Sequence, residues 1–220
     1  GGMIKNVVLL GFYVGERYFE EFSNSDPFPQ VAAYKLEGRF REALKLGGAN
    51  VESVASVAVS TYPRNKTYFF PGSEFVDEFG KGVVTPLLNL PILKLLSRFF
   101  GSVVALNRVR RKSLDAVCVY AAHTPNLLVA YLLRRVFKIP FFVYVPDLPS
   151  FMDMGMKRSL LLKFLKKVDG KIIDSLMSSC SGLFVISKYM VEDNSSWSNK
   201  PYCVLEGIAG GGAARESFKQ

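Results

Sequence analysis

The stretch from Leu114 to Ser150 constrains the fold of this 220-residue chain more than any other. It begins with Ala116–Ala122, a short apolar run rich in Val and Ala that has the length of a buried strand. The nearly all-apolar segment Asn126–Phe137 follows a Thr-Pro pair and predicts a helix buried on more than one side. A second apolar run, Phe141–Val145, predicts another strand. Two buried strands joined by a helix form a βαβ unit, which implies a parallel sheet.

Polar residues stand just past both strands of this unit. His123 follows the first strand and Asp147 follows the second. Open parallel sheets bind ligands in the crevice outside the carboxyl ends of their strands. Thr124 can cap the helix, and a helix N-terminus favours an anion such as a phosphate. Either residue alone is equally compatible with an ordinary loop role, so the prediction of a ligand site depends on the same pattern recurring along the chain.

The pattern does recur. Further strands are predicted at Ile4–Leu10, Val51–Ser60, Thr67–Phe70, Gly82–Leu90, Gly182–Ile186 and Pro201–Leu205, and further helices at Val31–Leu46, Pro91–Val109 and Lys157–Met177. Residues 16–30 predict a loop. The turn from Gly11 through Tyr13 suits close approach of backbone to a ligand, and Ser187 and Glu206 follow later strands. The chain is therefore predicted to be an α/β protein with a Rossmann-like, doubly wound, mostly parallel sheet.

The amino-acid composition indicates which class of protein this is and in which cellular compartment it is expected. Hydrophobic residues make up 49% of the chain and charged residues 21%, which favours a sizeable core over disorder. The three cysteines, Cys118, Cys180 and Cys203, lie in or near apolar runs, so buried thiols in a reducing, cytoplasmic compartment explain them best. A single histidine and no CxxC pair exclude the common histidine-rich and cysteine-rich metal sites. Every long apolar run is interrupted by Lys or Arg, so no membrane-spanning segment is predicted.

The net charge of +9 is concentrated in one part of the chain. Residues 79–146 contain ten basic residues and one acid, whereas the remainder is balanced. A one-sided charge favours an anionic ligand or surface. A surface that touches an anionic membrane is predicted at Lys94, Arg98, Arg108, Arg110, Arg111 and Lys112. An ordinary solvated basic face is the other interpretation.

The segments V-V-L-L-G, A-V-C-V-Y-A-A-H, P-F-F-V-Y-V-P-D, C-S-G-L-F-V-I-S and K-P-Y-C-V-L-E-G-I resemble a known family in their order and spacing. They are similar to the N-terminal half of a retaining glycosyltransferase of family 4, which has the two-domain GT-B architecture. The family's recurrent positions fall here on His123, Asp147, Ser187 and Gly207. Two departures are Pro146, where the family commonly has His, and Glu206, where it commonly has Asn.

The resemblance implies an acceptor-binding domain over residues 3–208, with residues 209–220 as a hinge toward a donor-binding domain beyond this chain. Residues 1–2 are interpreted as a cloning scar. The implied activity moves a sugar from a nucleotide-sugar to a saccharide acceptor, including lipid-linked acceptors, in glycan or polysaccharide biosynthesis. The nucleotide-sugar is a co-substrate, and neither a metal nor another cofactor is expected. This chain alone is expected to be inactive and to lie in the cytoplasm or on the inner face of the membrane.

The resemblance also assigns roles to individual residues. His123 is expected to contact the reacting sugar or the acceptor hydroxyl, and Asp147 to position that hydroxyl. The substrate-binding positions are Gly11, Tyr13, Thr124, Ser187, Glu206 and Gly207. The alternative function is a non-enzymatic, basic Rossmann-like module that binds a nucleotide or polyanion. Nucleic acid is disfavoured as its ligand because no recognition-helix or RNP pattern is present.

Overall fold

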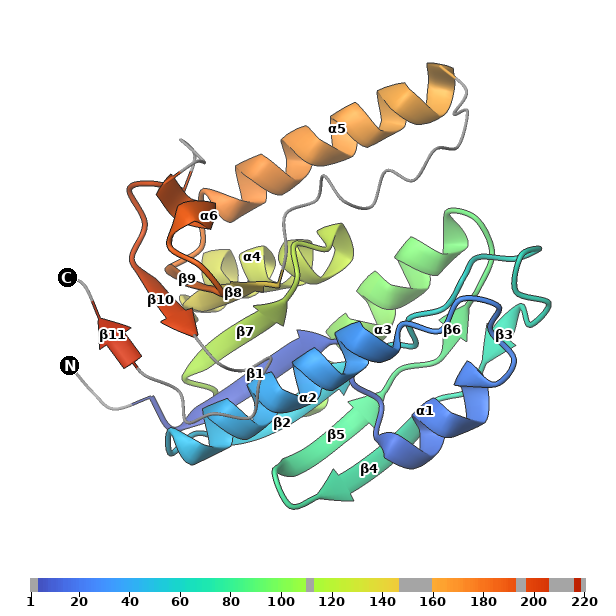
Figure 1. Cartoon of the computed structure of the whole chain (residues 1–220), viewed down its shortest axis with the longest axis horizontal. Helices are drawn as coiled ribbons and strands as arrows, with labels where there is room; N and C mark the ends of the chain where they lie inside the picture. The colour runs from blue at the N-terminus through green and yellow to red at the C-terminus, as the bar shows by residue number, and fades with distance from the viewer. Residues whose placement is uncertain (1–3, 110–112, 147–159, 193–196, 206–215, 219–220) are drawn as a thin grey trace.

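The computed structural model describes residues 4–109, 113–146, 160–192, 197–205 and 216–218 (Figure 1). The strands of its main sheet are β1 (Asn6–Gly11), β2 (Asn50–Ala55), β4 (Ser73–Asp77), β5 (Gly80–Val84), β7 (Ala116–Tyr120), β8 (Phe141–Val145), β9 (Gly182–Val185), β10 (Tyr202–Leu205) and β11 (Glu216–Phe218). Within the described residues their order is β11-β10-β9-β8-β7-β1-β2-β5-β4. All neighbours pair in parallel except at the two edges, where β4 and β11 are antiparallel. The predicted mostly parallel sheet is confirmed, and β11 lies inside the segment predicted as a hinge.

The central strands are buried on both faces, which is why they read as continuous apolar runs. Side chains alternate between the faces, so Val8 and Leu10 of β1 point into one core while Val7 and Leu9 point into the other. The helices are α1 (Glu16–Ser23), α2 (Val31–Leu46), α3 (Leu93–Val109), α4 (Thr124–Phe137), α5 (Leu160–Met177) and α6 (Tyr189–Glu192). Helices α3, α4 and α5 pack on the first core, and α2 packs on the second (Figure 1).

Two regions differ from the prediction. Residues 16–23 form helix α1, where a loop was predicted, because Phe22 and its aromatic neighbours pack into a third core, in which Phe19 stacks on Tyr34 with ring centroids 3.9 Å apart. The predicted strand 82–90 is divided, because Pro86 cannot donate a ladder hydrogen bond. Its first part belongs to β5, and its second part, β6 (Leu87–Leu88), pairs with β3 (Phe69–Phe70) in a separate small sheet.

The strand order creates a topological switch point between β1 and β7. From β1 the chain proceeds to β2 on one side, and from β7 it proceeds to β8, β9 and β10 on the other. Connections at such a point leave in opposite directions and open a crevice at the carboxyl ends of the two strands. The loops that follow Gly11 and Tyr120 lie at this switch point.

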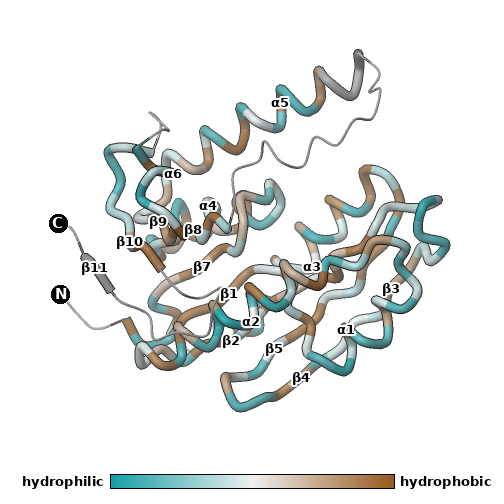
Figure 2. The backbone as a smooth tube through the Cα atoms, viewed as in Figure 1, coloured by the Kyte–Doolittle hydropathy of each residue, from teal (hydrophilic) through white to brown (hydrophobic). Residues whose placement is uncertain are grey.

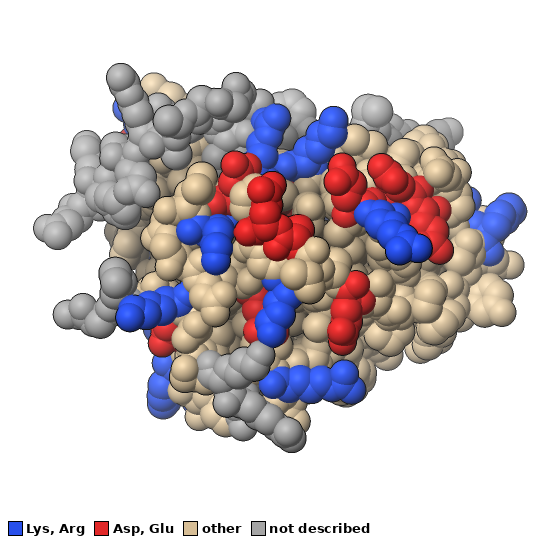
Figure 3. Space-filling model, turned by 90° about the horizontal axis from the view of Figure 1, so that it is seen from below, with Lys and Arg blue, Asp and Glu red and all other residues tan. Residues whose placement is uncertain are grey.

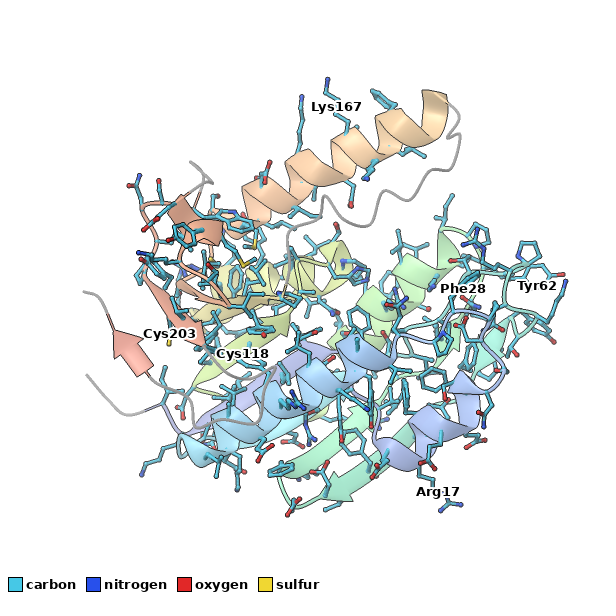
Figure 4. The ribbon with its side chains drawn as sticks, in the orientation of Figure 1. Arg17, Phe28, Tyr62, Cys118, Lys167 and Cys203 are labelled. Carbon is cyan, nitrogen blue, oxygen red and sulfur yellow. The ribbon has the colours of Figure 1, made fainter. Side chains whose placement is uncertain are left out.

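The cysteines are buried thiols, as predicted. Cys118 lies on β7 and Cys203 on β10, both in the sheet (Figure 4), and Cys180 is buried just before β9. Burial raises the pKa of Cys118 to about 12, so its thiolate is scarce at neutral pH. None of the helices in the described ranges is both long and apolar enough to cross a bilayer.

Candidate functional site

The loops after β1 and β7 meet at the switch point. The ring of Phe12 contacts the imidazole of His123 edge to face, with centroids 5.2 Å apart. The two residues are far apart in sequence, and the parallel pairing of β1 with β7 brings them together. This contact is the centre of the candidate site.

Local backbone geometry places His123 directly before helix α4 at the switch point. Ala121 adopts a left-handed conformation, with φ of 64°, and the His123 N–H donates to the Ala121 carbonyl at 2.9 Å. Such a conformation is strained for a residue with a Cβ, and strain of this kind is concentrated at functional sites. Helix α4 then begins at Thr124, with Pro125 in its first turn. The His123 side chain makes no capping hydrogen bond, which leaves the imidazole for other partners.

The main partner of His123 is a buried arginine from α3. The Nη1 atom of Arg98 lies 3.3 Å from Nε2 of His123, and the Arg98 side chain is 6% exposed. A guanidinium donates and cannot accept, so Nε2 of His123 is the acceptor and the imidazole proton resides on Nδ1. The structure therefore assigns the tautomer of His123, which has an Nδ1–H group available as a donor.

Arg98 is itself held by the loop that follows β2. Its Nε donates to Oγ of Ser56 at 3.1 Å, and its Nη2 donates to the carbonyl of Val57 at 2.8 Å. Its guanidinium also lies over the ring of Phe12, 5.1 Å from the centroid. Arg98 thus connects the loops that follow β1, β2 and β7.

A second cation, Lys94, lies one helical turn before Arg98. Its ammonium donates to the Val59 carbonyl and, at 3.2 Å, to Oγ1 of Thr61. Across the described ranges, no acidic side chain forms an ion pair with either cation. Two desolvated cations that form no ion pair favour an anionic ligand at this edge of the sheet.

Burial and this clustering shift the pKa values of all three groups. Burial, with the charges of Arg98 and Lys94, lowers the pKa of His123 to about 3. Burial and the charge of Arg98 lower the pKa of Lys94 to about 8, although Asp26 opposes the shift. Burial lowers the pKa of Arg98 to about 10. At neutral pH the site therefore contains a neutral imidazole beside two cations.

The expected membrane-facing role of Lys94 and Arg98 is wrong. Both side chains point inward, because they lie on the face of α3 that packs against the loops after β2. Arg108 is exposed, as expected. Residues 110–112, which hold the other three predicted basic residues (Arg110, Arg111 and Lys112), lie outside the described part of the chain.

Gly11 has a packing role that the sequence did not reveal. Both carboxyl oxygens of Glu37, on α2, accept from the Phe12 N–H, at 2.9 and 3.0 Å. A Cβ atom on residue 11 would overlap the Glu37 carboxyl group, so a larger residue requires this buried carboxyl group to move. Burial raises the pKa of Glu37 to about 7 despite the hydrogen bonds from the loop backbone and the charge of Arg41. Contact of Gly11 with a substrate remains a prediction.

Tyr13 belongs to a different cleft. Its ring stacks on Tyr34, with centroids 4.7 Å apart, and lies 4.4 Å from the guanidinium carbon of Arg41. Arg41 is fully buried and forms an ion pair with Asp77 at 2.7 Å. Tyr13 also lines a cleft of about 660 Å³ between α1 and the edge strand β4. The structure thus places Tyr13 in the aromatic and arginine packing around α1 and not beside the imidazole of His123.

The remaining predicted residues make other contacts or lie outside the described residues. The Thr124 hydroxyl does not cap α4 and donates instead to Oδ1 of Asp169 on α5 at 2.5 Å. Ser187 follows β9, and its Oγ accepts from the Tyr189 N–H at 3.4 Å. Asp147, Glu206 and Gly207 lie outside the described residues, so their roles remain predictions.

Sequence reasoning missed the roles of Phe12, Glu37 and Arg98. For Arg98 the sequence did contain a signal, because its four-residue spacing from Lys94 places both cations on one face of a helix. Asn126 was also missed: it is buried in the first turn of α4, and its Nδ2 atom has no partner in the described part of the chain. Groups of three His, Cys, Asp or Glu side chains suited to a metal are absent from the described residues.

These features define a Rossmann-like α/β domain with a candidate site at its topological switch point. Its backbone is similar to sucrose-phosphate synthase from Thermosynechococcus elongatus, with a TM-score of 0.56 and 12% sequence identity. That match covers 92% of this chain and 48% of the synthase. A second structure of the same protein matches with a TM-score of 0.50 and 13% identity, covering 90% of this chain and 86% of the other. No family model and no curated protein sequence matches the chain.

At this level of identity the similarity shows the fold, which is the mostly parallel sheet of one half of a GT-B glycosyltransferase. The predicted fold class is confirmed. The chain spans about half the length of the synthase chain of the first match.

Proposed function

We propose that this chain is the acceptor-binding half of a glycosyltransferase that moves a sugar from a nucleotide-sugar to a saccharide or lipid-linked acceptor. The observation that carries the proposal is the neutral imidazole of His123, oriented by Arg98 at the switch point and flanked by Lys94. The similarity to sucrose-phosphate synthase supports the proposal at the level of the fold. The resemblance of the strand-end motifs to family 4 supports it at the level of residues.

The proposed reaction separates charge, and the site is suited to that separation. The bond between the anomeric carbon and the donor diphosphate breaks, a bond to the acceptor oxygen forms, and the acceptor hydroxyl loses its proton. Negative charge therefore develops on the departing diphosphate, where positive groups lower the barrier. Lys94 and Arg98 supply a positive potential at this edge of the sheet, and neither forms an ion pair with an acid among the described residues.

The low pKa of His123 defines its part in this scheme. An imidazole with a pKa of about 3 is a poor general base at neutral pH. Its Nδ1–H is well suited to donate a hydrogen bond to a hydroxyl of the sugar or acceptor. We therefore assign His123 a binding and orienting contact and leave the acceptor proton to another group.

The test begins with the reading frame that contains this chain, expressed in full. Purified protein is incubated with a panel of nucleotide-sugars and saccharide acceptors, and release of nucleoside diphosphate is measured. His123→Ala is expected to lower turnover by about tenfold or more. Leu46→Ala is the matched control, because Leu46 is 77% exposed at the far end of α2, near the amino ends of the strands.

The result separates the two candidate functions. Acceptor-dependent release that falls in His123→Ala and not in Leu46→Ala supports transfer. Turnover that is unchanged in a folded His123→Ala protein removes His123 from the site. Tight, salt-sensitive binding of nucleotide or polyanion without any transfer supports the alternative of a non-enzymatic binding module.

A further inference from the structure

Helix α3 has its polar and apolar faces reversed relative to an ordinary surface helix. Lys94, Arg98 and Ser102 recur every four residues and face the protein interior, where Arg98 and Ser102 are buried. The opposite face is apolar and exposed, with Phe100 at 60% and Val104 at 58%. The exposed apolar residues of the helix and its start are Ile92, Leu93, Leu95, Leu96, Phe100, Val103 and Val104. Single exposed apolar residues are common, but a continuous stripe on a helix marks an interaction surface.

The neighbouring helix extends this apolar surface. Helices α3 and α4 pack against one another in the layer that covers one face of the sheet, and Figure 2 shows apolar residues along both. The exposed apolar residues of α4 are Leu132, Val136 and Phe137. The outward sides of the two helices together are named the α3–α4 surface.

The charged residues of α3 and α4 themselves have one sign, and an acid in contact with them is Asp169 of α5, which accepts from Thr124 at the start of α4. Neither α3 nor α4 contains an Asp or Glu residue. The exposed charged residues of the two helices and of the residue after α4 are Arg108, Arg135 and Lys138. The side of the molecule that carries α1 and β4 differs, because acidic and basic side chains are mixed on it (Figure 3).

We infer that the α3–α4 surface binds the interfacial region of an anionic lipid bilayer. Apolar side chains beside basic ones, on two helices that contain no acid of their own, match the chemistry of that region. There the apolar side chains enter the boundary between headgroups and acyl chains, and the cations contact lipid phosphates. A helix that lies in the interface need not span the membrane, which agrees with the lengths and hydropathy of the described helices. Charge complementarity selects the lipid surface over an uncharged apolar partner.

This surface is connected directly to the candidate site. The inner face of α3 holds Arg98 against His123, and the outer face of the same helix forms the membrane contact. The site therefore lies about 10 Å, roughly one helix diameter, from the inferred lipid surface. Where the proposed transfer takes place, this position suits an acceptor that is anchored in the membrane, a consequence that rests on the proposed function.

The test is co-sedimentation of the 220-residue chain with vesicles of phosphatidylcholine alone or with added phosphatidylglycerol, at low and high salt. Binding is expected to the anionic vesicles and to weaken as salt rises. Phe100→Asp combined with Val104→Asp is expected to weaken binding by about tenfold or more, because two apolar side chains no longer insert into the bilayer. Val76→Asp is the matched control, since Val76 is 83% exposed on β4 and should leave binding unchanged.

A second double variant separates the contribution of charge to vesicle binding from the contribution of apolar insertion. Arg135→Ala combined with Lys138→Ala is expected to weaken binding at low salt more than at high salt, because both cations are exposed next to Val136 and Phe137. Circular dichroism and thermal unfolding establish that each variant is folded. These measurements do not depend on sugar transfer, so failure of this inference and failure of the proposed function are distinguishable.

Three outcomes would overturn the inference. The first is no binding of the unmodified chain to anionic vesicles at low salt. The second is equal binding by the folded Phe100→Asp, Val104→Asp variant. The third is self-association without lipid, abolished by the same variant and accompanied by no vesicle binding, which would assign the surface to contacts between copies of the chain.

Discussion

The pH dependence of stability tests the environment of His123 without any substrate. In the folded chain burial lowers the pKa of this imidazole to about 3, whereas the ordinary value in an unfolded chain is 6.5. As the pH falls from 7 to 5, the unfolded chain binds a proton at His123 and the folded chain does not. Folding stability therefore falls, by about 2 kcal/mol between pH 7 and pH 5, since one pKa unit corresponds to about 1.4 kcal/mol.

Glu37 produces the opposite slope over the same range. Its folded pKa is about 7 and its ordinary value is 4.5, so between these values the folded chain retains a proton that the unfolded chain loses. Stability therefore falls as the pH rises, again by about 2 kcal/mol between pH 5 and pH 7. In the unmodified protein the two contributions cancel, and stability should be nearly independent of pH in this window.

Single substitutions should reveal separately how His123 and Glu37 each change the folding stability with pH. His123→Gln removes the histidine contribution, so its stability should decrease by about 2 kcal/mol from pH 5 to pH 7. Glu37→Gln removes the opposing contribution, so its stability should increase by a similar amount over the same range. The double variant should again be nearly flat. Asp26 and Asp115, whose pKa values are lowered, contribute below this window and cancel in the comparison.

The assay is urea unfolding at pH 5, 6 and 7, followed by the fluorescence of Trp197, the single tryptophan, which is 4% exposed. Because the chain has one histidine, NMR of the imidazole provides an independent check, and its signals should not titrate between pH 7 and pH 5. Equal pH slopes for the unmodified protein and His123→Gln would refute the reasoning. An imidazole that titrates near pH 6.5 would refute it as well.

Three further predictions concern the contacts around the site. Arg98→Met removes the donor to Nε2 of His123 and one nearby positive charge, so the pKa of His123 should rise. The pKa should stay below 6.5, because burial is the main cause of its depression. A fall or no change of this pKa in an NMR titration would contradict the prediction. Gly11→Ala should destabilise the protein by about 1–3 kcal/mol in urea unfolding, because the added Cβ overlaps the buried Glu37 carboxyl group. A variant as stable as the unmodified protein would show that this carboxyl group moves freely. Asp77→Ala leaves the buried Arg41 guanidinium without its anion and should lower the free energy of unfolding by about 3 kcal/mol or more. The exposed control Val76→Ala should lower it by less than about 0.5 kcal/mol.

Much of the fold follows from periodicity alone. Short runs of Val, Leu, Phe and Tyr separated by helical segments predict parallel strands, and each of β1, β2, β7, β8, β9 and β10 falls on such a run. The placement of His123 just past a strand end follows from the same pattern, because the carboxyl ends of parallel strands border the ligand crevice. The three buried cysteines were also readable from their apolar neighbours.

Helix α1 and strand β4 were not predicted from the sequence. Residues 16–23 do have apolar side chains at helical spacing, with Tyr18, Phe19 and Phe22 on one side, but a helix of eight residues is too short to be stable alone. Its stability depends on aromatic contacts with distant residues such as Tyr34 and Phe70. The role of Gly11 is likewise invisible locally, since the group that occupies its missing Cβ belongs to Glu37 on another element.

The orientation of α3 about its own axis could not be predicted from the sequence. Periodicity determines that Lys94 and Arg98 share one face and that Leu96, Phe100 and Val103 share the opposite one, because a helix has 3.6 residues per turn. It does not determine which face is buried. In the folded chain Arg98 meets Ser56, Val57 and His123, which lie 25 to 42 residues away in sequence. Those partners satisfy a desolvated guanidinium only once the sheet has formed, so tertiary structure alone decided that the cations face inward and the apolar side chains outward.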